Sequence, residues 1–148
     1  QLPEEKLMVA GKGTEMDKYQ NVVSQKHLKN VIFLGFQEKA QLQELMKKAK
    51  AVIVPSQWYE GFPMTVVEAF SMGVPVIGSN LRNVGRAIKD GVNGWLFHYD
   101  SVEDLVEKVR SCSATPRKQL QVKFEENLMP EGNYQALVTI YNHVIRKK

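Results

Sequence analysis

The residues best suited to chemistry lie in one stretch, 60–68, where two glutamates eight residues apart flank a predicted helix start. Pro63 suits the first turn of that helix, where its missing N–H would have had no partner. The amides of Met64, Thr65 and Val66 would then be unpaired at the positive end of the helix dipole. The sequence therefore predicts a phosphate site at the start of this helix.

The two glutamates and a glycine complete this predicted site. Gly61 lets the backbone approach a ligand closely. Glu68, about a turn and a half into the helix, could reach a group beside the phosphate, and Glu60 would face the opposite end of the same ligand. Carboxylates repel phosphate, so they fit better as acceptors for hydroxyl groups, as on two sugars joined through phosphates. A structural explanation stays open, because a carboxylate near a helix start is favourable by itself.

Alternating strands and helices must position these residues. Short apolar runs predict five strands: Lys6–Ala10, Asn30–Leu34, Ala51–Val54, Val74–Gly78 and Trp95–Phe97. Segments with helical periodicity predict helices at Glu15–Lys26, Glu38–Lys50, Pro63–Met72, Val84–Lys89, Arg117–Asn127 and Asn133–Arg146. A further helix begins after Ser101, whose spacing to Asp104 is typical of an N-cap.

This order predicts an α/β fold. Continuous apolar runs are typical of parallel strands that helices cover on both faces, so we expect a doubly wound, Rossmann-like parallel sheet of about five or six strands. Ligands bind such sheets outside the carboxyl ends of the strands. The loops after Ala10, Leu34, Val54 and Gly78 are therefore the candidate site, and residues 60–68 follow the third of these strands.

Composition excludes several classes of protein. With 148 residues, 43% of them hydrophobic and 24% charged, the chain has the profile of an ordinary globular domain. A net charge of +4 falls short of a nucleic-acid-binding signature, so no nucleic-acid partner is expected. The single cysteine, Cys112, favours a reducing, cytoplasmic location. His27, His98 and His143 lack ligand spacing, so we expect no metal site.

An ordered series of motifs within Val54–Gly94 resembles the carboxy-terminal half of glycosyltransferase family 4 enzymes. The motifs are Pro55-Ser56, Glu60-Gly61-Phe62-Pro63, Glu68-Ala69-Phe70-Ser71-Met72-Gly73-Val74-Pro75-Val76 and Asp90-Gly91-Val92-Asn93-Gly94. A weaker similarity extends from Lys6 to Lys108. These enzymes are retaining transferases of the GT-B fold, so the resemblance implies one half of a GT-B architecture.

The resemblance also implies roles for individual residues. Glu60 matches the catalytic glutamate that contacts the transferred sugar, and Glu68 matches the glutamate that binds the ribose hydroxyls. Phe36 and Gln37 match a loop that borders the nucleotide base. The family segment that lies along the sugar and diphosphate of the donor matches Gly61, Phe62, Pro63, Met64 and Thr65. Within this segment, Pro63 replaces the family's usual glycine.

The implied activity is sugar transfer from a nucleoside-diphosphate sugar, with retention at the anomeric carbon and with neither a metal nor another cofactor. A glycan or lipid-linked acceptor is implied, in polysaccharide, lipopolysaccharide or glycolipid synthesis. The nucleotide base, the sugar and the acceptor are not specified by the sequence. Two alternatives stay open: a non-catalytic nucleotide- or sugar-phosphate-binding module, and half of a sugar-nucleotide epimerase.

Besides Pro63, the sequence departs from the family pattern in two further respects. Arg82 stands where glycine is common and Arg86 where glutamate is frequent, so both could assist a diphosphate or simply face solvent. Family members also use an arginine and a lysine upstream of the strand at Lys6–Ala10, where this sequence has five residues.

We therefore expect residues 1–148 to be a single donor-binding domain of a larger enzyme, inactive without an N-terminal acceptor domain. Its C-terminal helix is expected at 131–148. The basic ending Arg146-Lys147-Lys148 is compatible with peripheral contact to an anionic membrane.

Overall fold

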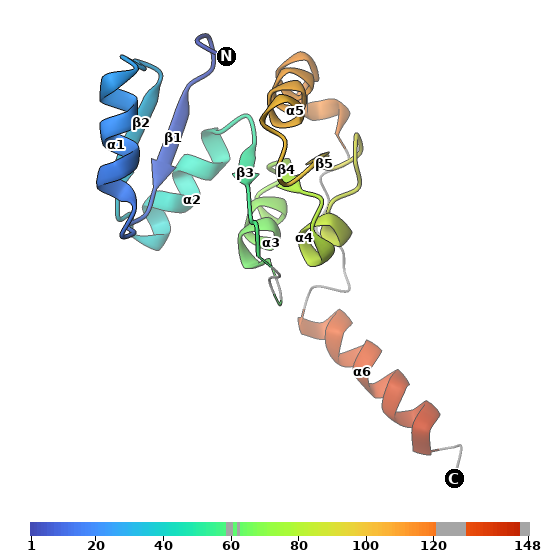
Figure 1. The fold of residues 1–148 in the computed structure, drawn as a ribbon. Coiled ribbons are helices and arrows are strands. Elements are labelled where there is room, and N and C mark those ends of the chain that lie inside the picture. The colour runs from blue at the N-terminus through green and yellow to red at the C-terminus, as the bar shows by residue number, and fades with distance from the viewer. Residues whose placement is uncertain (59–60, 62, 121–129, 146–148) are drawn as a thin grey trace. The chain divides into compact units, whose positions relative to one another are not determined.

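The computed structural model of the chain describes residues 1–58, 61, 63–120 and 130–145 (Figure 1). The chain forms two compact units, Gln1–Ala49 and Lys50–Lys148. Among the described residues, no helix combines the length and the apolar character that a membrane span requires.

The first unit is a β-α-β-α segment: β1 (Leu7–Ala10), α1 (Met16–Gln25), β2 (Val31–Gly35) and α2 (Lys39–Lys48). Its two strands are parallel, and Leu7 lies opposite Val31. The Asn30 side chain donates hydrogen bonds to the carbonyls of Leu2 and Glu5, at 2.9 and 2.7 Å, and so fixes the chain that leads into β1. A capping box between Glu38 and Gln41 starts α2.

The second unit contains the remaining elements: β3 (Val52–Val54), α3 (Met64–Ser71), β4 (Val76–Ser79), α4 (Arg82–Ala87), β5 (Gly94–Phe97), α5 (Val102–Ala114), the 3₁₀ turn η1 (Arg117–Gln119) and α6 (Pro130–Ile145). Its three strands are parallel in the order β3-β4-β5, so β4 is central. Every residue of β4 is buried.

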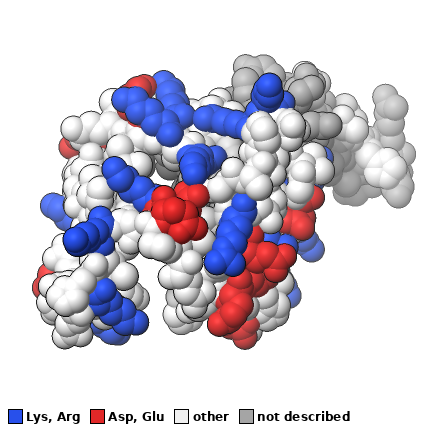
Figure 2. Space-filling view, turned by 90° about the horizontal axis from the view of Figure 1, so that it is seen from above, with Lys and Arg blue, Asp and Glu red and all other residues white. Residues whose placement is uncertain are grey.

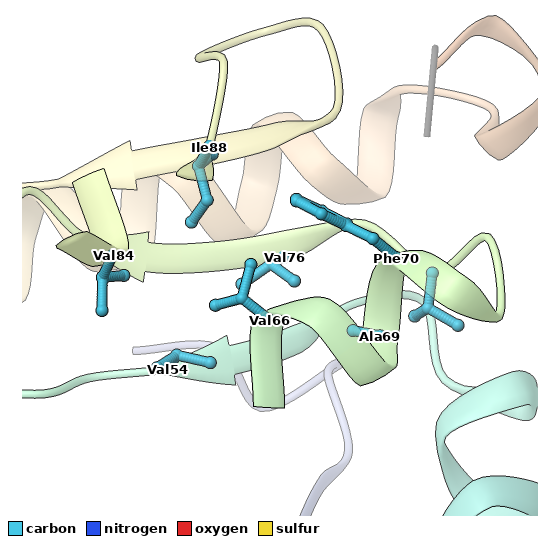
Figure 3. Packing of buried hydrophobic residues seen from close by; sticks show 8 residues of the cluster. Val54, Val66, Ala69, Phe70, Val76, Val84 and Ile88 are labelled. Atoms are coloured by element: carbon cyan, nitrogen blue, oxygen red, sulfur yellow. The ribbon is translucent and has the colours of Figure 1, made fainter. Parts of the chain in front are cut away.

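Helices cover both faces of this three-stranded sheet, with α5 on one side and α3 and α4 on the other (Figure 1). Successive residues of β4 alternate between the faces. Val76 packs with Val66 and Phe70 of α3 (Figure 3), whereas Ile77 packs with Cys112 of α5. The core therefore has two layers, one on each face of the sheet.

The predicted α/β class, with parallel strands and covering helices, is confirmed. We expected about five or six strands in one sheet, whereas the described residues form five strands in a two-stranded and a three-stranded sheet. A continuous apolar run indicates that a strand is buried. It does not indicate which other strand it pairs with, because that pairing depends on contacts between residues distant in sequence.

Three elements have boundaries that differ from those predicted. Because Pro75 has no N–H, the ladder of β4 begins at Val76, although the Pro75 carbonyl accepts a hydrogen bond from Val52 at 3.0 Å. The helix expected at 84–89 begins two residues earlier, at Arg82. Of the helix expected at 117–127, residues 117–119 form the 3₁₀ turn and 121–127 lie outside the described residues.

The motif at residues 90–94 folds as a turn that starts β5. The Asn93 side chain accepts a hydrogen bond from the amide of Lys89 at 2.8 Å, and the Asp90 carboxylate accepts one from the amide of Leu96 at 2.7 Å. Gly91 has a φ of +72°, which favours glycine. The residue types of this motif are thus explained by turn geometry.

Candidate functional site

The candidate site centres on the loop between β3 and α3, residues 55–63, which we call the site loop. It follows the carboxyl end of β3, the edge of a parallel sheet where ligands bind. Glu60 and Phe62 lie outside the described residues, so their predicted roles rest on the sequence. The site loop leads directly into α3, which carries Glu68.

The start of α3 differs in one respect from the prediction. Pro63 is the residue before the helix, with φ −79° and ψ 79°, and not part of its first turn. Its carbonyl accepts hydrogen bonds from the amides of Val66 and Val67, at 2.9 and 3.3 Å. The expectation that the Val66 amide is free is therefore wrong, because the tight first turn uses it. Among the described residues, no backbone hydrogen bond is donated by Met64 or Thr65, so these two amides remain for a ligand.

Helix periodicity places the polar and apolar residues of α3 on different sides. Val66, Ala69 and Phe70 are buried in the core, which leaves Thr65 exposed and Glu68 half-buried. Residues three apart in a helix are neighbours on its surface. Within the described part of the chain, the Glu68 carboxylate has no hydrogen bond or ion pair, so it can accept one from a ligand.

Two side chains, one at the end of β4 and one in α4, hold the backbone of the site loop. The Ser79 hydroxyl donates to the carbonyl of Ser56 at 2.7 Å, and the Asn83 side-chain amide donates to the carbonyl of Gly61 at 2.7 Å. Sequence reasoning missed both residues. The available signal was their place in or just after the end of β4, at the same edge of the sheet as the site loop.

The first unit holds the other two predicted binding residues. The Phe36 ring is 59% exposed after β2, and the Lys12 ammonium lies 5.6 Å from its centroid. Gln37 donates from its side-chain amide to the carbonyls of Leu34 and Phe36, at 2.8 and 3.1 Å. The ring of Phe36 is thus exposed but has a cation over one face, whereas the amide of Gln37 stabilises its own loop.

The charges of the surface are mixed. Arg82 and Arg86 are exposed and lie four residues apart on α4, so they share one side of that helix. Basic and acidic side chains are interspersed on the face that Figure 2 shows. The sequence left two roles open for these arginines, contact with a diphosphate or a position in solvent, and their exposure is compatible with both.

The sequence matches a known family over most of its length. Residues 1–128 match the model of the family described as glycosyl transferases group 1. The chain belongs to this family. Its fold is similar to that of GT-B glycosyltransferase domains.

Individual relatives agree with this assignment to the glycosyl transferases group 1. A lipopolysaccharide 1,6-galactosyltransferase of Salmonella typhimurium is 30% identical over 128 residues, which are 84% of this chain and 34% of that protein. The structure of the lipopolysaccharide outer core galactosyltransferase WaaB is similar with a TM-score of 0.65 and 30% identity, over 76% of this chain and 34% of that one. Anabaena HepE in complex with UDP-glucose shares the fold, with a TM-score of 0.71 and 21% identity over 99% of this chain and 42% of that one.

The chain spans only 25–34% of the lengths of the first four curated relatives that it matches. The candidate site of this chain has three described parts. These are a loop held by two side-chain hydrogen bonds, the backbone amides of Met64 and Thr65 at the start of α3, and the half-buried carboxylate of Glu68. Within the described residues, no group of three or more His, Cys, Asp or Glu side chains is arranged to hold a metal ion.

Proposed function

We propose that residues 1–148 form the donor-binding half of a retaining glycosyltransferase of family 4. This half would hold a nucleoside-diphosphate sugar while the sugar is transferred to a glycan or lipid-linked acceptor. The observation that supports it most directly is the site loop, which runs from the carboxyl end of β3 to the start of α3. No observation favours a phosphate-binding module or an epimerase half.

The described residues would bind successive parts of the donor. The amides of Met64 and Thr65 would donate to the diphosphate, where the positive end of the helix dipole favours negative charge. The Glu68 carboxylate would accept hydrogen bonds from the ribose hydroxyls. Phe36 and Gln37, in the first unit, are assigned to the border of the nucleotide base only by their match to the family loop.

The reacting end of the donor would lie along residues 60–62. We assign Glu60 to the hydroxyls of the transferred sugar by its match to the family motif, and Gly61 and Phe62 to the backbone that follows the sugar. When the bond between the anomeric carbon and the diphosphate breaks, negative charge grows on the leaving diphosphate. Amide donors aimed at that charge lower the barrier, and this proposal requires no metal or other cofactor.

The remaining partners are part of the same proposal. Because the chain spans a quarter to a third of the lengths of its relatives, we propose that a further N-terminal domain binds the acceptor. A cytoplasmic location would suit a nucleotide-sugar donor. Contact with a membrane would involve residues 146–148, which lie outside the described residues.

Calorimetric titration with UDP and UDP-glucose tests the site. UDP is the first probe, since the structurally similar HepE binds UDP-glucose. We expect Glu68→Ala to weaken both ligands by about 1–3 kcal/mol, because the ribose hydroxyls lose their acceptor. Glu60→Ala should weaken UDP-glucose alone, because only that ligand carries the transferred sugar.

The matched control is Glu107→Ala, which removes an exposed glutamate of α5 and should leave both affinities unchanged. If neither Glu60→Ala nor Glu68→Ala alters the affinity for UDP-glucose, the assignment of the site is wrong. If the wild-type chain binds other nucleoside diphosphates but not UDP, only the choice of base changes.

A further inference from the structure

The two hydrogen bonds to the site loop connect segments that are distant in sequence. Ser79 and its acceptor Ser56 are 23 residues apart, and Asn83 and its acceptor Gly61 are 22 residues apart. In both bonds a side chain donates to a backbone carbonyl of the site loop, at 2.7 Å. The loop is thus fixed at two points that lie five residues apart.

The residues that donate these bonds belong to a well-packed segment. Ser79 is fully buried at the end of the central strand, and the next amide, that of Asn80, donates to the carbonyl of Phe97 in β5 at 2.9 Å. The residue after Asn83, Val84, is 2% exposed in the core. A Cβ built on Gly85 would lie 3.1 Å from the backbone of Asn80, so α4 approaches the end of β4 closely. Asn83 therefore projects from a backbone that the core holds in place.

Gly61, in contrast, has no close packing against the described residues of the chain. The residue is exposed, and a Cβ built on it would have no atom within 4 Å, chain neighbours aside. Its backbone also has the wide conformational freedom of glycine. The hydrogen bond from Asn83 to the Gly61 carbonyl fixes the planar peptide unit that begins there. This bond supplies a restraint that side-chain packing does not.

We propose that Asn83 is a positioning residue for the donor site, with buried Ser79 as the second point of attachment. In this proposal Asn83 acts through the backbone of the site loop, to which it donates a hydrogen bond. By holding the Gly61 carbonyl, it keeps the backbone at this residue in the position that receives the donor. This inference rests on the proposed function, since it assigns the loop to donor binding. Preorganisation of a loop raises affinity because less conformational entropy is lost on binding.

The test combines a local and a functional measurement on the 148-residue chain. Asn83→Ala removes the side-chain amide, and Asn83→Asp replaces it by a group of the same shape that cannot donate at neutral pH. Asn83→Gln keeps an amide donor. The controls are Asn21→Ala and Asn21→Asp, because Asn21 is exposed on α1 and has no side-chain hydrogen bond among the described residues. Asn21→Asp also reproduces the charge change of Asn83→Asp.

We expect both Asn83→Ala and Asn83→Asp to lower the ¹³C′ order parameter of the Gly61 carbonyl below its wild-type value. Affinity for UDP-glucose should fall about 3- to 10-fold, the range for loss of one hydrogen bond. Asn83→Gln keeps an amide donor, so it should retain part of the wild-type order parameter and part of the affinity for UDP-glucose. The melting temperature should change no more than in the Asn21 variants, which separates positioning from global stability.

Two results would overturn the proposal. One is an unchanged order parameter of Gly61 in Asn83→Ala, because the loop would then be held by other contacts. The other is a mobile Gly61 with unchanged affinity for UDP-glucose, because the bond would then be structural only. If the wild-type chain binds no UDP or UDP-glucose, the proposed function fails for these donors. The Gly61 measurement then still decides whether Asn83 holds the loop.

Discussion

Gly94 shows how a single side chain would disturb this fold at the residue scale. A Cβ on Gly94 would lie 2.2 Å from the Val76 carbonyl oxygen, and that oxygen belongs to the central strand. We expect Gly94→Ala to lower the free energy of unfolding by about 2–3 kcal/mol, because the backbone of β4 or β5 must shift. Urea denaturation measures this change. Gly13→Ala is the control, since nothing lies within 4 Å of its Cβ, and equal losses in both variants would contradict the argument.

At the scale of one element, α5 depends on its N-cap residue, which directly precedes the helix. Ser101 accepts a hydrogen bond from the amide of Asp104 at 3.1 Å, as the N-cap spacing predicted. Ser101→Ala leaves that amide unpaired and should lower the free energy of unfolding by about 1 kcal/mol. The matched change Ser24→Ala, on the exposed part of α1, should have little effect in the same denaturation experiment. A loss no larger in Ser101→Ala than in Ser24→Ala would show that the cap does not stabilise α5.

At the scale of the whole molecule, the proposed function predicts that residues 1–148 bind the sugar donor but do not transfer the sugar by themselves. Residues 1–148 should bind UDP-glucose but release no UDP in an assay with glycan or lipid-linked acceptors, because acceptor binding is assigned to another domain. Catalysis requires both reactants to be held in a productive geometry, and one domain would hold only the donor. Release of UDP that depends on an acceptor would show that this chain is sufficient for transfer.

The periodicity of the sequence predicted the kinds of elements well and their ends less well. The helix expected at 38–50 is observed as α2 at 39–48. It was predictable as a helix because its apolar residues are spaced for one buried face. The helix at Val84–Lys89 was placed two residues late, because its start has no side-chain cap to mark it. Pro63 was placed inside a helix that begins after it, since a proline fits both positions.

The candidate site was predictable where its residues share one local segment. Glu68, Met64 and Thr65 follow from a helix start after a strand, and their spacing is visible in the sequence. Ser79 and Asn83 were missed because their acceptors lie 23 and 22 residues earlier in the chain. A serine or asparagine after a strand has many partners available, and only the packed backbone selects one.

The sequence by itself determined the α/β class, the presence of a helix at the candidate site and the family to which the chain belongs. Local periodicity and short ordered motifs are sufficient for these, because they depend on neighbouring residues. The tertiary structure alone decided the division of the strands into two sheets and the attachment of the site loop by Ser79 and Asn83. Both depend on contacts between residues that are distant in the sequence, and hydrophobic periodicity does not specify which distant residues come into contact.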